Sequence, residues 1–320
     1  MKLTRRQFFV TAAASSATIA AGAFIMTGDS KPAAVWRGAA LGGEARVSLY
    51  GRDINVAKTA LSLVTKEIER LESIFSLFQP NSELSRLNAA GTLSAPSRDL
   101  VALLRSAIDW REKTNGAFDP AVQPLWQAAS DGVAVTPGLL ALSAAPIAVT
   151  DDAIHLAPGA RLTLNGIAQG HIADRVAAIL SSHGFNDCVV DTGELRLLGP
   201  NMRAIGIPAV KAAISVAGVA IATSEPKSKI FDARTFRHHL IDPKTGASPR
   251  LWESISVFAP TAEAADALST AFAVMPHEAV ANLVEALGNI AIIGADGRGR
   301  VRRYGDIRTI NPAHAGGLTS

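Results

Sequence analysis

The chain has 320 residues, 48% of them hydrophobic, which is enough to bury the core of one large domain or of two closely packed ones. Aromatic residues make up only 5%, and this composition favours an α/β globule over a disordered chain. The net charge of +3 arises in residues 1–26, which hold three basic residues and no acidic one, so the remainder has 28 basic and 28 acidic residues. That balance gives no argument for nucleic-acid binding.

The first 26 residues have the pattern of an export signal. The run from Thr4 to Phe9, with Arg5 and Arg6 at its centre, resembles a twin-arginine signal, and an Ala-rich, mildly apolar stretch follows it. A membrane anchor is the alternative, but the many Ala, Ser and Thr residues make this stretch weakly apolar. We expect export of the folded protein to the bacterial periplasm, with cleavage after Ala23.

The sequence predicts a linker, a strand and two helices in the first part of the chain. Residues 27–40 are expected to form a linker, with the folded domain starting near residue 38, and residues 45–51 a strand. A helix is predicted over 53–78 because apolar residues recur at helical spacing. Its apolar stripe consists of Leu61, Val64, Ile68, Leu71, Phe75 and Phe78. A second helix is predicted near 97–113, ended by Asn115-Gly116.

The second half alternates connections, helices and short strands. Residues 127–160 are rich in Ala, Pro and Gly and are expected to form surface connections. Helices are predicted near 168–183, 261–275 and 276–287, short strands within 187–223, and two final strands within 289–304 joined by Asp296-Gly297. Helices among many short strands indicate an α/β or α+β fold with one central sheet, extending to about residue 310 and followed by a tail, 311–320.

The single cysteine, Cys188, excludes an intramolecular disulfide and a cysteine-based zinc site. It lies in an apolar run of strand character, so we expect it to be a buried small hydrophobic residue.

The strongest chemical signal lies between residues 231 and 275. Two adjacent histidines, His238 and His239, precede an Asp-Pro-x-Thr-Gly turn. A predicted helix then carries Asp266 and Thr270 four residues apart, which places both on one helix face. Together they offer two hard oxygen ligands to Mg²⁺, and a divalent ion beside an imidazole suits phosphoryl transfer.

Three further blocks can contact a ligand. Phe78 and the turn after it offer an aromatic face and polar groups to a planar ligand, although an ordinary helix end explains them as well. The Ala-Phe-Asp turn at 117–119 offers backbone groups and a carboxylate. A turn containing Gly166 and Gly170 opens a helix, whose free N–H groups attract phosphate. Its spacing matches neither the dinucleotide fingerprint nor the P-loop.

Together these blocks resemble the ApbE family, the FAD:protein FMN transferases, over residues from about 38 to 295. The resemblance rests on the order and spacing of six short motifs. They are residues 82–88 (SELSRLN), 118–122 (FDPAV), 166–170 (GIAQG) followed by Asp174, 222–224 (ATS), 238–246 (HHLIDPKTG) and 265–271 (ADALSTA). The resemblance implies a single large, T-fold-like domain with a central, mainly antiparallel sheet flanked by helices.

The resemblance also implies a reaction. FAD binds with Mg²⁺ on its diphosphate, and a threonine hydroxyl of an acceptor flavoprotein attacks the phosphorus on the FMN side. FMN becomes joined to the acceptor by a phosphoester bond, and AMP leaves. A nearby base and in-line positioning suit this chemistry.

The same resemblance assigns roles to positions of this chain. The metal would be held by Asp266, Thr270 and the carbonyl of Gly166. His239 would be the general base or a phosphate-orienting group, and Asp174, the second catalytic assignment, would support the helix that presents Gly166 and Gln169. The implied FAD-binding residues are Leu41, Phe78, Ala117, Phe118, Asp119, Thr163, Gln169, Leu240 and Ile241.

The chain departs from the family pattern at four positions. The family commonly has Asp at Thr163, Lys at Gln169, and Gly at Glu194 and Glu225. These variants look like those of the NosX branch. That resemblance implies a periplasmic role in maturation of the nitrous oxide reductase system, with a membrane-bound acceptor of the NosR type. It also implies that the protein contacts the membrane only through that acceptor or the signal segment. Two alternatives stay open, a flavin-binding assembly protein without turnover and an FAD pyrophosphatase that uses water as the acceptor.

Overall fold

The computed structural model describes residues 31–51 and 54–310. The export segment and the tail, on which the sequence made predictions, lie outside the described residues.

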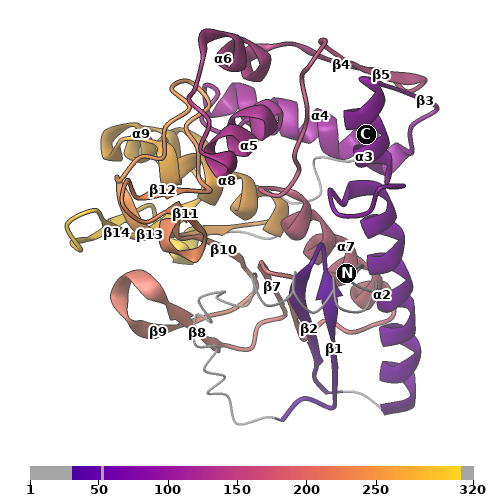
Figure 1. Ribbon diagram of the computed structural model, residues 1–320. Coiled ribbons are helices and arrows are strands. Elements are labelled where there is room, and N and C mark those ends of the chain that lie inside the picture. The colour runs from indigo at the N-terminus through magenta and orange to yellow at the C-terminus, as the bar shows by residue number, and fades with distance from the viewer. Residues whose placement is uncertain (1–30, 52–53, 311–320) are drawn as a thin grey trace, which may run out of the picture.

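A sheet of eight strands forms the centre of the molecule, and every neighbouring pair in it is antiparallel (Figure 1). This confirms the predicted central antiparallel sheet. The strands, in spatial order, are β1 (Ala34–Ala40), β2 (Gly43–Leu49), β6 (Cys188–Asp191), β7 (Leu195–Leu198), β10 (Ala220–Ser224), β13 (Trp252–Ala259), β14 (Ala291–Asp296) and β15 (Val301–Tyr304).

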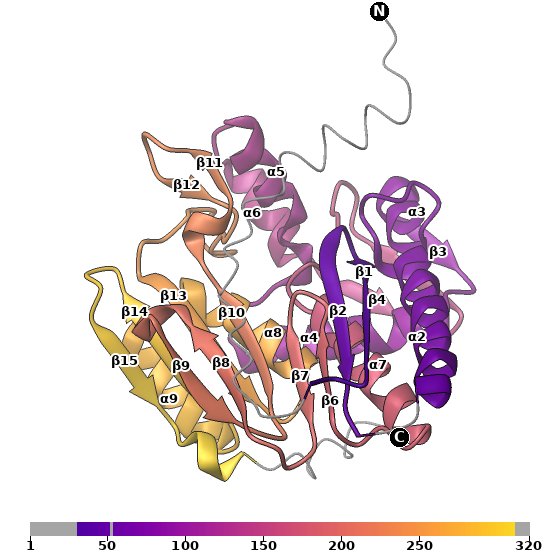
Figure 2. The same cartoon turned by 90° about the horizontal axis from the view of Figure 1, so that it is seen from below.

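One face of this sheet is covered by helices, and the other by a hairpin (Figure 2). Side chains alternate between the two faces along each strand, so that Cys188 and Val190 enter the helical core while Val189 enters the opposite one. The helices are α2 (Ile54–Phe75), α3 (Glu83–Ala90), α4 (Arg98–Lys113), α5 (Gln123–Asp131), α6 (Pro137–Ala144), α7 (Ala168–Ser182), α8 (Ala262–Val274) and α9 (His277–Leu287).

The remaining strands form small sheets outside the central one. Hairpin β8 (Arg203–Ile207) and β9 (Ala212–Val216) contributes Ile205 and Val216 to the second core. A three-stranded sheet contains β3 (Thr92–Ser94), β4 (Ile147–Val149) and β5 (Ala153–Leu156), and a short pair contains β11 (Ile230–Asp232) and β12 (Arg237–His238).

The structure corrects two predicted connections. The expected linker contains β1, which pairs with β2 through a two-residue turn at Leu41 and Gly42, both with positive φ. β1 is an edge strand with several exposed residues, so its sequence lacks a clear apolar alternation. The segment 127–160 contains α6 and the end of α5 as well as two strands. Half of the residues of α6 are exposed, and its apolar residues are not separated onto one face, although Leu139 and Leu140 pack against a small hydrophobic cluster. Thr136 caps α6 and Pro137 starts it.

The other long elements fall where the sequence predicts them, within a few residues. α2 buries Leu61, Val64, Ile68, Leu71 and Phe75 but ends at Phe75. Phe78 therefore leaves the predicted stripe, and 71% of it is exposed. Pro276 precedes the first residue of α9 instead of occupying it.

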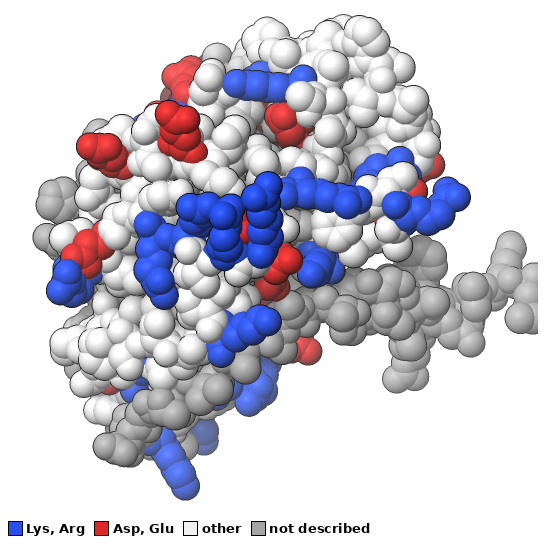
Figure 3. Space-filling view, turned by 90° about the vertical axis from the view of Figure 1, so that its left-hand side faces the viewer, with Lys and Arg blue, Asp and Glu red and all other residues white. Residues whose placement is uncertain are grey.

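Two further features are the hydropathy of the helices and the distribution of charge on the surface. Within residues 31–51 and 54–310, no helix combines the length and the hydropathy needed to cross a membrane. On the face that Figure 3 shows, Lys and Arg side chains form a band that is interrupted by Asp and Glu.

Candidate functional site

Helix α8 carries Asp266 and Thr270 one turn apart, as predicted. Asp266 is 3% exposed, and its Oδ2 accepts a hydrogen bond of 3.0 Å from the backbone N–H of Gly170, near the start of α7. Burial raises the pKa of Asp266 to about 8. No ion pair of the described residues includes Asp266. A buried carboxylate without a cationic side chain is a suitable ligand for a metal ion.

The turn before α7 brings Gly166 against Thr270. A Cβ atom at residue 166 would lie 2.7 Å from the Thr270 Oγ1, so only glycine allows this approach without movement of the threonine. Gly170 lies even closer to α8, since a Cβ there would be 2.1 Å from the carbonyl oxygen of Ala262. The fold thus gathers the three predicted metal-binding residues.

The donors available here are oxygens of different kinds. Among the residues that the structure describes, no cluster of three or more His, Cys, Asp and Glu side chains is arranged to hold a metal. A carboxylate, a hydroxyl and a backbone carbonyl form a set suited to Mg²⁺, which binds few protein groups and completes its shell with waters and phosphate oxygens. The residues therefore fit the ion that the family resemblance implies.

Asp174, which lies on α7, forms hydrogen bonds with the start of α8. Its two carboxylate oxygens accept hydrogen bonds from the N–H groups of Ala262 (3.0 Å) and Glu263 (2.9 Å), the first two residues of α8. Arg196 Nε lies 3.3 Å from the same carboxylate. Burial raises the pKa of Asp174, and Arg196 and the two N–H groups oppose that rise. Asp174 therefore positions the helix that carries Asp266 and Thr270, whereas the sequence assigned it to the support of α7.

A second group of predicted residues lies around the β1–β2 turn. The Leu41 N–H donates to Glu72 Oε1 at 2.5 Å, which ties the turn to α2. The exposed ring of Phe78 lies beside Gly42, where a Cβ would be 3.7 Å away. Gln169, at the start of α7, donates through Nε2 to the Thr192 carbonyl at 2.9 Å. An exposed aromatic ring beside a backbone turn can stack on a planar ligand.

Hydrogen bonds and an ion pair with residues before and after it hold the Ala-Phe-Asp turn in place. The Phe118 N–H donates to Thr114 Oγ1 at 3.0 Å, and the Phe118 ring is buried. Thr163 adjoins this turn because its N–H donates to the Pro120 carbonyl at 2.8 Å. Asp119 pairs with Arg111 Nε at 3.2 Å and accepts from the Ala121 N–H at 2.8 Å. Burial raises the pKa of Asp119 to about 6, and these contacts oppose the rise.

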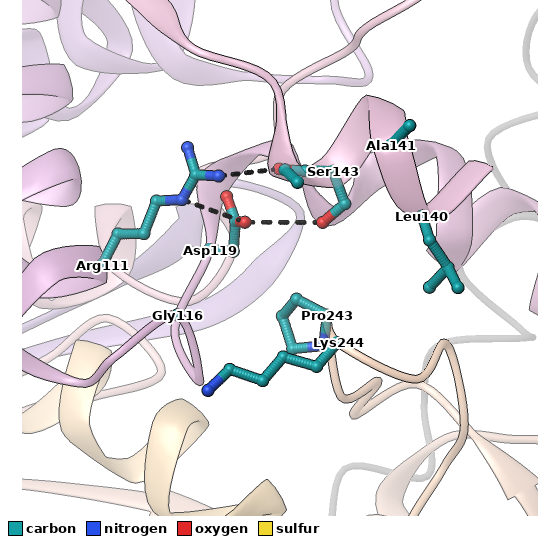
Figure 4. A pocket seen from close by; sticks show the side chains of 9 residues that line it. Arg111, Gly116, Asp119, Leu140, Ala141, Ser143, Pro243 and Lys244 are labelled. Atoms are coloured by element: carbon teal, nitrogen blue, oxygen red, sulfur yellow. Dashed lines mark hydrogen bonds and ion pairs between the residues drawn. The ribbon is translucent and has the colours of Figure 1, made fainter. Parts of the chain in front are cut away.

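A cavity of about 470 Å³ lies beside Asp119 (Figure 4). Arg111, Asp119 and Ser143 form one wall through mutual contacts, and Pro243 and Lys244 of the Asp-Pro-x-Thr-Gly turn face them. Sequence reasoning missed Arg111 and Lys244. Lys244 stands within a motif that was recognised, but nothing in the sequence showed that this motif lies opposite the Ala-Phe-Asp turn.

The two adjacent histidines have different environments. His238 is fully buried, where its Nε2 lies 3.0 Å from the Pro249 carbonyl and its Nδ1 accepts from the Leu240 N–H at 3.3 Å, so it holds the loop together. His239 Nδ1 lies 3.2 Å from the Lys229 carbonyl. Burial lowers the pKa of His239 to about 4, which keeps the imidazole neutral at pH 7. The hydrogen bonds of His239 within the described chain reach Lys229, not Asp266 or Thr270. Leu240 and Ile241, which follow, are buried.

Comparisons with known proteins place this arrangement in a family. The curated FAD:protein FMN transferase of Treponema pallidum is 31% identical over 285 residues, which cover 73% of this chain and 76% of that protein. Two solved structures have the same fold at 24% identity. They are the flavin transferase ApbE of Vibrio cholerae, with a TM-score of 0.72 over 87% of this chain and 99% of that one, and the ApbE protein of Thermotoga maritima, with a TM-score of 0.74 over 85% and 96%. The sequence profile of the ApbE family also matches residues 41–293, which is most of the chain. The chain therefore belongs to the ApbE family.

Proposed function

We propose that this protein is a Mg²⁺-dependent FAD:protein FMN transferase. A threonine hydroxyl of the acceptor attacks the phosphorus on the FMN side of the FAD diphosphate. A new P–O bond joins FMN to the threonine, the bond from that phosphorus to the bridging oxygen breaks, and AMP leaves with the bridging oxygen. The hydroxyl proton passes to a base. Curated relatives from several bacteria bear the name of this activity, which supports the proposal.

The observation that carries the proposal is the buried Asp266 carboxylate, without an ion-pair partner in the described chain, in a place where Thr270 and Gly166 also meet. Asp266, Thr270 and the Gly166 carbonyl would hold Mg²⁺. Bound there, the ion would offset the negative charge that develops on the diphosphate oxygens. Gly170 fixes Asp266 through its N–H, and Asp174 fixes the start of α8, so the protein holds these oxygens in place before the substrate arrives.

His239 is proposed as the group that accepts the threonine proton or orients a phosphate oxygen. The Lys229 carbonyl can only accept a hydrogen bond, so Nδ1 of His239 carries the proton and Nε2 is left as an acceptor. Burial lowers the pKa of His239 to about 4, which favours the unprotonated form of this acceptor at neutral pH. Phe78 and the Leu41 turn are proposed to bind a flat ring of FAD, and the turns at Ala117–Asp119 and Leu240–Ile241 to bind another part of it.

We further propose that the acceptor is a membrane-bound flavoprotein of the NosR type, within maturation of the nitrous oxide reductase system, and that the reaction takes place in the periplasm. The export signal in residues 1–26 and the variant residues Thr163, Gln169 and Glu194 support this assignment. Replacement of Arg5 and Arg6 by Lys is expected to stop export, and normal periplasmic levels of that variant would contradict the proposed route.

The test is a reconstituted reaction of the protein with FAD, MgCl₂ and a threonine-bearing acceptor fragment. We expect an acceptor band with flavin fluorescence in a denaturing gel and one AMP per labelled acceptor, with loss of both when EDTA is added or when Asp266 is replaced by Ala. The same fragment with valine in place of threonine is the control. A dark acceptor band would contradict the transferase. FMN and AMP formed without acceptor would identify a pyrophosphatase, and FAD binding without turnover an assembly protein.

A further inference from the structure

We propose that an arginine surface near His239 docks the acceptor protein through acidic residues that lie about five positions from its target threonine. The inference rests on the proposed function and names the chemistry by which the acceptor would be recognised. The arginine surface consists of Arg234, Arg250, Arg298, Arg300 and Arg302.

Positive charge is concentrated in the two segments that carry this surface. Residues 227–250 and 296–304 hold ten basic and three acidic residues, whereas the rest of residues 27–320 holds 18 basic and 25 acidic ones. The neutral balance of residues 27–320 therefore hides a strongly basic region. The β14–β15 turn projects toward the side of the fold that Figure 3 shows, and Lys and Arg side chains form a band across that side.

Loops from three parts of the chain meet to form the arginine surface. In the β14–β15 turn, the Gly297 N–H donates to the Leu251 carbonyl at 2.9 Å, which brings this turn beside Arg250. Arg250 donates through Nη2 to the Thr235 carbonyl at 2.8 Å, in the β11–β12 turn that also carries Arg234. Arg250 thus connects the two turns, and the arginines of both lie close to it.

A single buried carboxylate serves the arginines that follow the β14–β15 turn. Asp296 Oδ2 lies 3.1 Å from Arg300 Nε and 3.2 Å from Arg302 Nη2, and its Oδ1 accepts two backbone N–H groups. The Asp296 side chain is only 2% exposed, while that of Arg300 is 60% exposed. The carboxylate therefore orients the guanidinium groups, whose outer faces stay open to a partner.

The other arginines have weaker partners or none of opposite charge. Asp232 lies 3.9 Å from Arg234 Nε, and the Arg234 side chain is 93% exposed. No ion pair of the described residues includes Arg250 or Arg298, which are both exposed. Exposed guanidinium groups bind carboxylates through paired, charge-assisted hydrogen bonds, so the surface suits an acidic partner.

A row of rings leads from this surface to the proposed base. The Arg250 guanidinium lies 4.7 Å from the centre of the Phe236 ring, that ring is 5.5 Å from the His238 ring, and the two histidine rings are 6.4 Å apart. Taken end to end, these distances place the His239 ring at most about 17 Å from the Arg250 guanidinium. An extended peptide covers that length in about five residues.

The acceptor is the partner that the reaction itself brings to this place. Its threonine has to reach the phosphorus beside His239, so the polypeptide around the threonine extends over the neighbouring surface of the enzyme. Carboxylates on that polypeptide would bind the exposed guanidinium groups, whereas a basic segment would be repelled. The surface would thus select acceptors as well as attract them.

The experiment uses the acceptor fragment in two versions, with Asp or with Asn at the fifth and sixth residues on each side of the threonine. Binding to the full protein with FAD and MgCl₂ is measured by fluorescence anisotropy, with valine in place of the threonine so that no transfer takes place. We expect the Asp version to bind about tenfold more tightly at low salt, and this preference to shrink at about 0.3 M NaCl.

The variant Arg234→Glu/Arg298→Glu is expected to abolish the preference, because it reverses two exposed charges of the surface. The control, Lys58→Glu/Lys66→Glu, changes the net charge equally at exposed positions of α2, on the opposite side of the fold, and is expected to keep the preference (Figure 1). Melting temperatures show whether each variant is folded. Arg298→Glu alone, with a loss of about threefold, replaces the double variant if that one does not fold.

Equal binding of the two fragments to the wild type, or a preference that survives in Arg234→Glu/Arg298→Glu, would overturn the inference. Binding of the wild type to phosphatidylglycerol vesicles without any preference for the Asp fragment would also overturn it, and would assign the surface to lipid. If both threonine-bearing versions are labelled with FMN equally well, the inference fails and the proposed function stands. If the preference depends on the arginines but no threonine is ever labelled, the docking surface stands and the proposed function fails.

Discussion

Replacement of Asp174 by Ala tests whether this residue holds the helix of the metal site. The change removes both acceptors at the start of α8, so the N–H groups of Ala262 and Glu263 lose their partners, and Ala262 is fully buried. It also removes the charge that faces Arg196, whose Nη1 already lacks a hydrogen-bond partner among the described residues. Thr261, which caps the helix through Ala264, stays in place.

The magnitude follows from these contacts. A lost capping contact costs about 1 kcal/mol, and an interior ion pair broken on one side costs about 3–5 kcal/mol when both groups are fully buried. Asp174 keeps 24% of its side chain exposed, so we place the total at about 4 kcal/mol. At about 2–4 °C per kcal/mol, the melting temperature is expected to fall by roughly 10 °C.

The assay combines thermal unfolding with Mn²⁺ affinity, because displacement of α8 also moves Asp266 and Thr270. The matched control is Asp109→Ala. Asp109 forms an exposed ion pair with Lys113 on α4 at 2.6 Å, and its loss is expected to cost less than about 1 kcal/mol. An Asp174→Ala protein that melts within 2 °C of the wild type and binds Mn²⁺ equally well would refute the reasoning.

Three further changes give clear expectations. Gly170→Ala places a Cβ 2.1 Å from the Ala262 carbonyl oxygen, so α7 and α8 must separate. The free energy of unfolding in urea is expected to fall by more than about 3 kcal/mol. An unchanged urea midpoint would contradict the close contact between the two helices. Burial raises the pKa of Asp119 from 3.8 to about 6, so the folded state holds the proton more tightly than the unfolded chain. The contribution of Asp119 to stability is therefore fully present below pH 4 and is lost, by about 3 kcal/mol, as the pH rises past 6. The difference in unfolding free energy between the wild type and Asp119→Asn is expected to be larger at pH 4 than at pH 7 by about this amount. Cys188 is fully buried, and burial raises its pKa to about 12. A thiol reagent at pH 8 is therefore expected to label it only after unfolding. Rapid labelling of the folded protein would show that β6 opens.

The sequence predicts those parts of the fold and site that depend on local spacing. The stripe on α2 as far as Phe75, the length of α4, and the pair Asp266 and Thr270 on one helix follow from helical periodicity and are confirmed as structural elements. β1 and α6 were missed because an edge strand and a half-exposed helix lack the apolar pattern that marks buried elements.

Contacts between distant segments could not be predicted. Asp174 reaches a helix that begins 88 residues later, and no spacing rule indicates which helix start it will meet. The adjacent histidines could not be distinguished either, since only the packed loop shows that His238 is enclosed while His239 turns to Lys229. The raised pKa of Asp119 likewise arises from burial beside α6, which the sequence did not reveal.

The side chain of Gln169 fills the gap between two glycines from different turns. A Cβ at Gly43 would lie 3.1 Å from its Nε2, and one at Gly193 would lie 2.3 Å away. Positions 43 and 169 therefore share one volume, so a bulkier residue at 43 requires a shorter one at 169. The φ of +102° at Gly193 requires glycine there whatever residue stands at 169. In an alignment of relatives we expect positions 43 and 169 to covary and position 193 to remain glycine. Natural variation at the turn near Leu41 would thus be linked to variation at the start of α7.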